Sequence, residues 1–134
     1  MDRLTRVEME ILELAEDDYV GLWVVVKLVQ ESTMGDEEIS KTSKFHWIPE
    51  ISTDDPDLLE SFHKTMTVVD DLIRNDLVQV GMLYETCGFV RWEADPHQLS
   101  CAIAHEWNIL GRLPRLGEVV WLDITDKGSR ELSR

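Results

Sequence analysis

The chain has 134 residues, 43% of them hydrophobic and 30% charged, which predicts one globular domain with a single core. Thirteen Lys and Arg stand against 27 Asp and Glu, and the formal net charge of −14 disfavours nucleic-acid backbones and favours basic partners. No apolar run approaches the ~20 residues that cross a bilayer, and the acidic start does not resemble a signal peptide. The sequence therefore predicts a cytoplasmic protein without membrane contact, with two free cysteines.

The first third of the chain predicts two helices. Thr5 and Glu8 have capping-box spacing and precede an apolar stripe. Asp18 is expected to cap a second helix. The valine run at residues 24–26 would also be compatible with a strand. We expect a helix because apolar residues recur at helical spacing on both sides of the valines: Tyr19, Leu22, Trp23, Val26 and Val29.

Residues 31–55 are expected to form a long loop, because Gly35, Pro49 and a polar run interrupt any periodicity. A loop of this length in a compact domain suggests an insertion with its own role. Its apolar residues either pin the loop to the body, which we favour, or present a binding patch: Phe45, Trp47, Ile48 and Ile51.

The clearest helix is predicted at residues 56–74. Asp55 is a suitable N-cap, Pro56 fits the first helical position, and Asn75 is expected to end the helix in the left-handed conformation. One face of this helix is apolar, through Leu58, Leu59, Phe62, Met66, Val69, Leu72 and Ile73. The Asp70-Asp71 pair is expected to lie at a solvated edge of that face.

The second half predicts strands around one more helix. Residues 77–84 and 89–92 are expected to form strands joined by a turn. Asp95-Pro96 repeats the cap-and-proline start of a helix that Gly111 ends. Residues 119–124 predict the last strand, and Thr125 is expected to cap a short terminal helix.

This order of elements resembles a winged-helix domain. Residues 71–78 (DLIRNDLV) are similar to the junction after the third helix of such domains. Residues 121–128 (WLDITDKG) are similar to the close of the wing in regulators of the multiple-antibiotic-resistance type. The chain departs from the winged-helix pattern at two places, the loop at 31–55 and a helical insertion in the wing at 93–117. It resembles uncharacterised small bacterial proteins that have such an insertion in the wing. The resemblance implies an α+β, winged-helix-like single domain, with three or four helices and a small antiparallel sheet.

The resemblance places residues 56–74 where a recognition helix would lie, and this helix is acidic. A helix that reads DNA presents positively charged side chains to the bases and phosphates. The face of this helix opposite the apolar stripe instead carries Asp57, Glu60 and Asp71. The candidate DNA contacts are instead in or near the wing: Arg91, Arg112 and Arg115.

One helix carries a pattern of potential metal ligands. His97, Cys101 and His105 follow one another at four-residue spacing, which would place three metal ligands on one helix face. No further ligand motif completes the set, so a polar helix face is the preferred interpretation. No catalytic motif is recognisable, and we expect no enzyme activity and no cofactor.

These observations favour a non-enzymatic acidic module that binds a basic protein, such as an immunity protein or inhibitor of a basic toxin. The expected contact residues are Asp57, Glu60, Asp71, Trp47 and Trp92. The alternative is a winged-helix transcription regulator that binds DNA, as a homodimer formed through the first helix and the tail.

Overall fold

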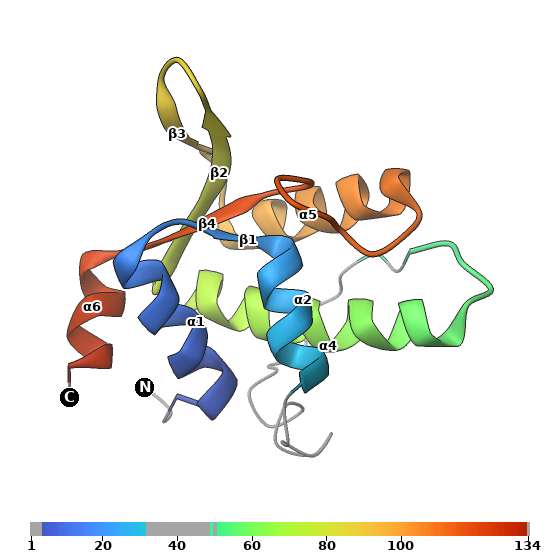
Figure 1. The fold of residues 1–134 in the computed structure, drawn as a ribbon, viewed down its shortest axis with the longest axis horizontal. Coiled ribbons are helices and arrows are strands. Elements are labelled where there is room, and N and C mark those ends of the chain that lie inside the picture. Colours follow the sequence, from blue (N-terminus) through green and yellow to red (C-terminus); the bar gives the residue numbers. More distant parts are fainter. Residues whose placement is uncertain (1–3, 32–48, 50, 134) are drawn as a thin grey trace.

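The computed structural model describes residues 4–31, 49 and 51–133, and these residues form an α+β fold, as predicted (Figure 1). They contain five helices and one four-stranded antiparallel sheet. The elements in chain order are α1 (Arg6–Asp17), β1 (Val20–Gly21), α2 (Leu22–Glu31), α4 (Pro56–Arg74), β2 (Val78–Tyr84), β3 (Gly88–Arg91), α5 (Pro96–Leu110), β4 (Trp121–Ile124) and α6 (Asp126–Leu132). Within the described segments, no helix combines the length and the apolar character needed to cross a membrane.

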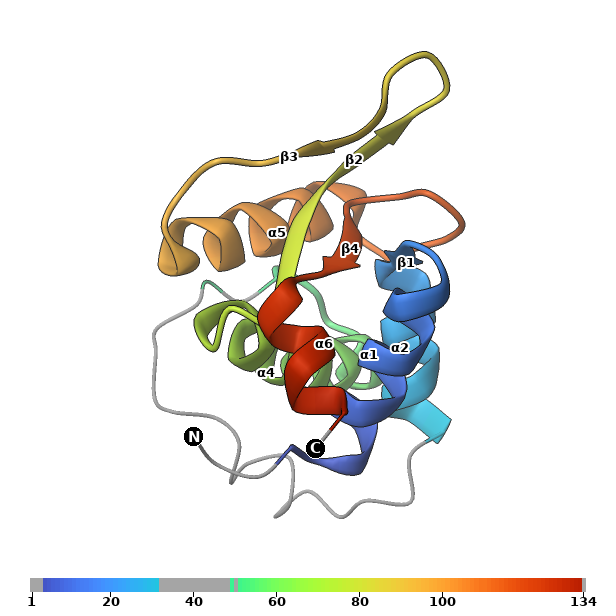
Figure 2. The ribbon, with the colours of Figure 1, turned by 90° about the vertical axis from the view of Figure 1, so that its left-hand side faces the viewer.

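The sheet has the strand order β1-β4-β2-β3, so the last strand lies between the first two. Val80 of β2 and Val20 of β1 both pair with Leu122 of β4. In Figure 2 the helices α1, α2, α4 and α6 lie below these three strands, whereas the far end of the β2–β3 hairpin extends beyond the rest of the chain. The hairpin is therefore the part of the sheet with the least support from the core.

Helix α4 is more deeply buried than its apolar stripe predicted. Ten of its 19 residues are buried, among them Ser61, Thr65 and Asp70. The additional burial arises because α5 packs on α4 from one side while α2 packs from another. Phe62 of α4 and Trp107 of α5 meet edge to face with ring centroids 5.0 Å apart.

The predicted start of the second helix was wrong. Asp18 is the C-cap of α1, and its backbone amide donates to the carbonyl of Leu14. Val20 and Gly21 form β1 instead of helix, because they pair with β4 from the other end of the chain. Helix α2 begins at Leu22, whose amide donates to the carbonyl of Val120.

Several other details differ from the prediction: β2 begins at Val78 and not at residue 77, and β3 covers residues 88–91 and not 89–92. Asn75 is the C-cap of α4 but has φ −86°, and Asp76 takes the left-handed conformation, with φ 58°. The last strand begins at Trp121 and not at residue 119, because Val119 has φ 71°, which interrupts extended backbone. The caps predicted at Thr5, Asp55, Asp95, Gly111 and Thr125 are confirmed.

The two phrases that carry the winged-helix resemblance lie in contact. Thr125 donates its backbone amide to the carbonyl of Leu77 at 3.0 Å and its hydroxyl to the carbonyl of Asp76 at 2.6 Å. The same hydroxyl accepts from the amide of Gly128 at 3.0 Å. Gly128 is buried against Leu77, which lets α6 approach the α4–β2 junction closely.

The predicted insertion at 31–55 is described only in part. Ile51 is buried in the core, as the pinning interpretation requires, and the amide of Ser52 donates to Asn108 of α5. The other apolar residues of this loop, Phe45, Trp47 and Ile48, lie outside the described residues.

Candidate functional site

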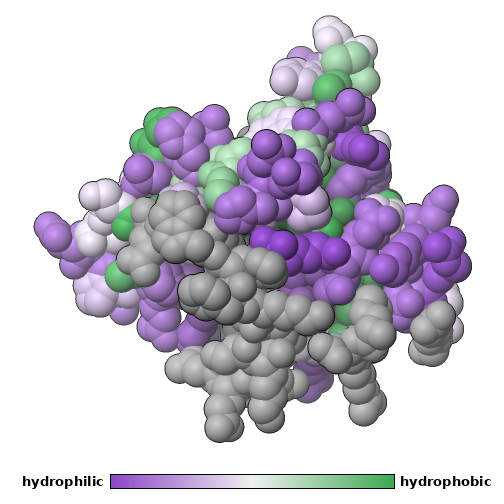
Figure 3. Space-filling model, turned by 180° about the vertical axis from the view of Figure 1, so that it is seen from behind, coloured by the Kyte–Doolittle hydropathy of each residue, from purple (hydrophilic) through white to green (hydrophobic). Residues whose placement is uncertain are grey.

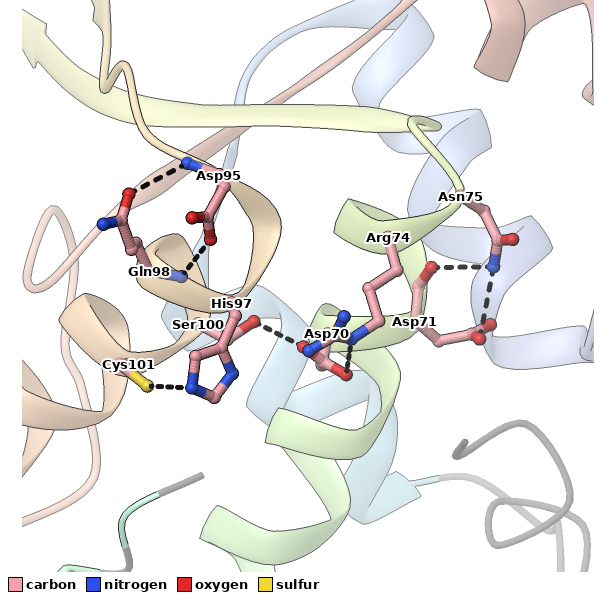
Figure 4. Close-up of polar contacts among 9 residues, drawn as sticks. All are labelled: Asp70, Asp71, Arg74, Asn75, Asp95, His97, Gln98, Ser100 and Cys101. Atoms are coloured by element: carbon pink, nitrogen blue, oxygen red, sulfur yellow. Dashed lines mark hydrogen bonds and ion pairs between the residues drawn. The ribbon is translucent and has the colours of Figure 1, made fainter. Parts of the chain in front are cut away.

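The first candidate site is the face of α5 that was expected to present three metal ligands. Cys101 Sγ lies 3.5 Å from His97 Nε2 (Figure 4). His105 is exposed two turns further along the helix, roughly 12 Å from His97 along the axis. In the part of the chain that the structure describes, no three His, Cys, Asp or Glu side chains are grouped so that they could hold a metal ion.

The thiol of Cys101 is poorly suited to nucleophilic or metal chemistry. Burial raises its pKa, and the charge of Asp70 raises it further against a smaller opposing effect of Arg74. The thiolate is the nucleophile and the metal ligand, so a raised pKa lowers the reactive fraction at neutral pH. The contact with His97 is therefore that of a neutral thiol with an imidazole.

We expect added zinc to leave the melting temperature of the protein unchanged. A structural zinc site needs four ligands, and this face of α5 brings two candidate ligands into contact. Thermal melts with and without zinc test this expectation. A stoichiometric increase in melting temperature that a chelator reverses would contradict it.

Beside this face, a buried polar cluster joins α5 to α4 (Figure 4). Asp70 accepts from the hydroxyl of Ser100 at 2.6 Å and from Arg74 Nε at 2.8 Å. Ser100 is fully buried and Asp70 is 6% exposed, so Asp70 does not lie at a solvated edge, contrary to the sequence prediction. The cluster fixes the position of α5 against α4, since breaking it would leave a carboxylate buried without partners.

The three acidic residues that were expected to contact a partner do not form one surface. Asp57 and Glu60 are exposed near the start of α4, and Glu60 pairs with Lys64 at 2.9 Å. Asp71 lies about 21 Å from Asp57 along the helix axis. It is half-buried there and faces α1. Of the three, only Asp57 and Glu60 are placed to contact a partner together.

Asp71 belongs instead to a carboxyl pair with Glu8 of α1. Glu8 is 1% exposed; its Oε1 accepts from the Thr5 amide at 2.9 Å, whereas its Oε2 has no hydrogen-bond donor in the described structure. Burial, and next the neighbouring Asp71 side chain, raise the pKa of Glu8 to about 8. At neutral pH the carboxyl group of Glu8 is therefore largely protonated, beside the side chain of Asp71.

The three arginines of the alternative interpretation have different surroundings. Arg112 is held by Glu118 through two hydrogen bonds of 2.7 Å, and this contact lowers the pKa of Glu118 to about 2. Arg91 and Arg115 are exposed, on β3 and in the loop before β4. One of the three guanidinium groups is thus already neutralised by an intramolecular carboxylate.

The two tryptophans proposed as partner anchors gain no support. Trp92 is half-buried and packs against the hydrophobic core, and its amide extends the β2–β3 ladder by donating to the carbonyl of Val80. An anchor needs a side chain that is free to enter a partner's pocket, which the packed ring of Trp92 is not. Trp47 lies outside the described residues.

A more concentrated acidic surface lies at the C-terminal end of α1. Glu13, Glu16, Asp17 and Asp18 are exposed, and Leu14 between them is 43% exposed. None of the four carboxylates forms an ion pair with a residue of the described segments. We call these four residues the α1 acidic end. Only Asp18 of this run was used in the sequence prediction, as a helix cap, although four acidic residues within six positions were a usable signal.

Comparisons with known proteins add no relative: no protein-family model, no curated protein and no solved structure matches the chain.

Proposed function

We propose that this chain is a non-enzymatic module that binds a basic protein through the α1 acidic end, on a winged-helix-like frame. The proposal for the frame is supported by the order of the elements and by the three strands β1, β4 and β2, with α4 leading directly into β2. It is further supported by the contact between the Thr125–Gly128 segment and the α4–β2 junction.

The observation that carries the proposed function is the position of the acidic residues on α1. The C-terminus of a helix is the negative end of its dipole, so acidic residues there are unfavourable and basic residues favourable. The last turn of α1 holds no basic residue, and Glu16, Asp17 and Asp18 follow one another there. This arrangement costs stability and concentrates negative potential beside the exposed Leu14, as a docking surface for a basic partner requires.

In its concrete form, the proposal is that the protein is an inhibitor or immunity protein that covers the basic active site of a toxin such as a nuclease. The net charge of −14 would accelerate association with such a partner. Asp57 and Glu60 on α4 would form a second, weaker contact.

DNA binding through Arg91, Arg112 and Arg115 is the alternative, and it is less well supported. Helix α4, which would be the reading helix, is packed between α2 and α5 and carries Asp57 and Glu60 on its free side. Arg112 would have to leave Glu118 to reach a phosphate. Such binding would also act against the repulsion between DNA and the whole-molecule charge.

The test uses two triple variants with the same change in net charge. Glu13→Gln, Glu16→Gln and Asp17→Asn neutralise the α1 acidic end, whereas Asp54→Asn, Glu93→Gln and Glu106→Gln neutralise exposed residues elsewhere. The partner is captured from cell extract at low salt, identified by mass spectrometry and purified. Association rates are then measured over a range of salt concentrations.

We expect a partner of basic pI whose association slows with salt, and about a tenfold slower association for the α1 variant than for its charge-matched control. The α1 variant should keep or raise its melting temperature, because it removes charges that oppose the helix dipole. A partner of acidic pI, or equal rates for the two variants, would contradict the proposal. A mobility shift with random duplex DNA at low salt that disappears at high salt would favour the regulator.

A further inference from the structure

Strand β3 is an open edge of the sheet. It is the last strand in the order β1-β4-β2-β3, and its hairpin with β2 extends from the body of the molecule (Figure 2). An exposed edge presents unpaired backbone donors and acceptors to any strand that can reach it. The chemistry of this edge therefore depends on which of its amides and carbonyls face outward.

The register identifies the outward-facing groups. The Trp92 amide donates to the carbonyl of Val80, so residues 80 and 92 are a hydrogen-bonded pair. Because such pairs alternate along an antiparallel ladder, Val90 bonds inward to Met82, while Phe89 and Arg91 direct their amides and carbonyls away from β2. The edge thus offers two donors and two acceptors, on either side of Val90.

This pattern is complementary to itself. If a second β3 lies antiparallel with Val90 opposite Val90, each Phe89 faces an Arg91 and all four outward groups of each chain form hydrogen bonds. The two Val90 residues then form a non-hydrogen-bonded pair, with Cβ atoms about 4.5–5.5 Å apart. Val90 is 45% exposed in the single chain, and Met82 beside it is half-buried, so the pairing would align four apolar side chains across four strands.

Charge also favours a second copy at this edge. Residues 78–91 contain one acidic and one basic residue, Glu85 and Arg91, so the hairpin is neutral in a chain of net charge −14. In Figure 3 the projecting hairpin at the top shows hydrophobic beside hydrophilic residues, whereas the coloured surface below it is mostly hydrophilic. Pairing through β3 therefore places a segment without net charge at the contact between the two chains.

We propose that the protein forms a two-fold symmetric dimer by antiparallel pairing of β3 with β3 of a second copy, centred on Val90. The dimer does not use the first helix and the tail; these segments, α1 and α6, pack against each other within one chain. It uses backbone groups of β3 and no carboxylate of the α1 acidic end, although Tyr19, next to Asp18, stacks on Phe89 with ring centroids 5.0 Å apart.

A disulfide test reports the register directly. Val90→Cys in a Cys87→Ser background is expected to form an intermolecular disulfide under mild oxidation, because the two Cβ atoms lie near bonding distance. The unchanged chain is the matched control. Its Cys87 is exposed, but in this register the two Cys87 residues lie roughly 20 Å apart, and Cys101 is present in both proteins.

Sedimentation velocity on the full chain gives the second readout. We expect Val90→Lys to weaken the dimer at least about tenfold, since like charges directly opposite in a sheet repel. Val90→Thr, which keeps the branched shape, should have a much smaller effect. Dimerisation should strengthen with salt, because the two bodies have the same sign of charge, whereas salt weakens binding to a basic partner.

The proposal is overturned if the chain remains a monomer at high protein and salt concentrations. It is equally overturned if the Val90→Cys variant forms no more disulfide than the unchanged chain, or if Val90→Lys and Val90→Thr behave alike. Failure of the partner-binding experiment leaves these outcomes unaffected, because none of them involves the α1 acidic end.

Discussion

Glu8→Gln is expected to stabilise the protein by roughly 2–4 kcal/mol at about pH 9 and to have little effect at about pH 4.5. A glutamine keeps an oxygen that accepts from the Thr5 amide, and its NH2 group can donate to Asp71. Unlike the carboxyl group of Glu8, the glutamine amide does not ionise. Because glutamine is neutral at every pH, the variant avoids the buried charge that the carboxylate acquires at alkaline pH.

The sign of the effect follows from the direction of the pKa shift. Burial raises the pKa of folded Glu8 from 4.5 to about 8, so the folded protein holds this proton more tightly than the unfolded chain. The stability that the proton contributes is complete below pH 4.5 and is lost as pH rises through about 8. The difference between the variant and the wild type should therefore grow across this window and level off above it.

Urea denaturation at several pH values measures this difference. Glu13→Gln on the exposed side of α1 is the control and should change stability little at any pH. Glu8→Ala should be destabilising at about pH 5, because it leaves the Thr5 amide without its acceptor, and less so at about pH 9, where it also removes the buried charge. If the stability curves of the wild type and Glu8→Gln run parallel between pH 5 and 9, the folded protein does not hold the Glu8 proton more tightly than the unfolded chain does.

Gly128→Ala is expected to cost about 2–4 kcal/mol of unfolding free energy, although alanine is the better helix former by about 1 kcal/mol. A Cβ at this position would lie 2.3 Å from the carbonyl oxygen of Leu77 and 2.8 Å from Cγ1 of Ile124. The carbonyl belongs to the backbone at the α4–β2 junction and already accepts from Thr125. Helix α6 would have to move away, which would strain the Thr125 hydrogen bonds.

Ser129→Ala, one residue further along α6, is the matched control and should be neutral or slightly stabilising. Its side chain is half-buried, and no hydrogen bond of its hydroxyl is seen in the described structure. Thermal and urea denaturation of both variants give the comparison. A Gly128→Ala protein as stable as the wild type would mean that α6 is not held against Leu77 as closely as described.

The candidate site was predictable only in its general character. Composition indicated an acidic binding module, and the structure retains Asp57 and Glu60 as exposed acidic residues. Asp71 could not be placed correctly, because its orientation depends on α1 packing beside α4. The α1 acidic end is local in sequence and could have been recognised from its position at a helix C-terminus.

The sequence by itself determined the helix boundaries where a side chain satisfies nearby backbone groups. Thr5, Asp55, Asp95 and Thr125 cap the helices that follow them, because a cap needs donors only two or three residues away.

Only the tertiary structure decided the features that depend on distant partners. Val20–Gly21 became a strand because β4, about a hundred residues later, supplies its hydrogen bonds. Asp70 became buried because α5 covers α4, and Glu8 keeps its proton because packing buries it and places it beside Asp71. The free energy of strand pairing and of burial depends on the segment that packs alongside. The local spacing of residues does not show which segment that will be.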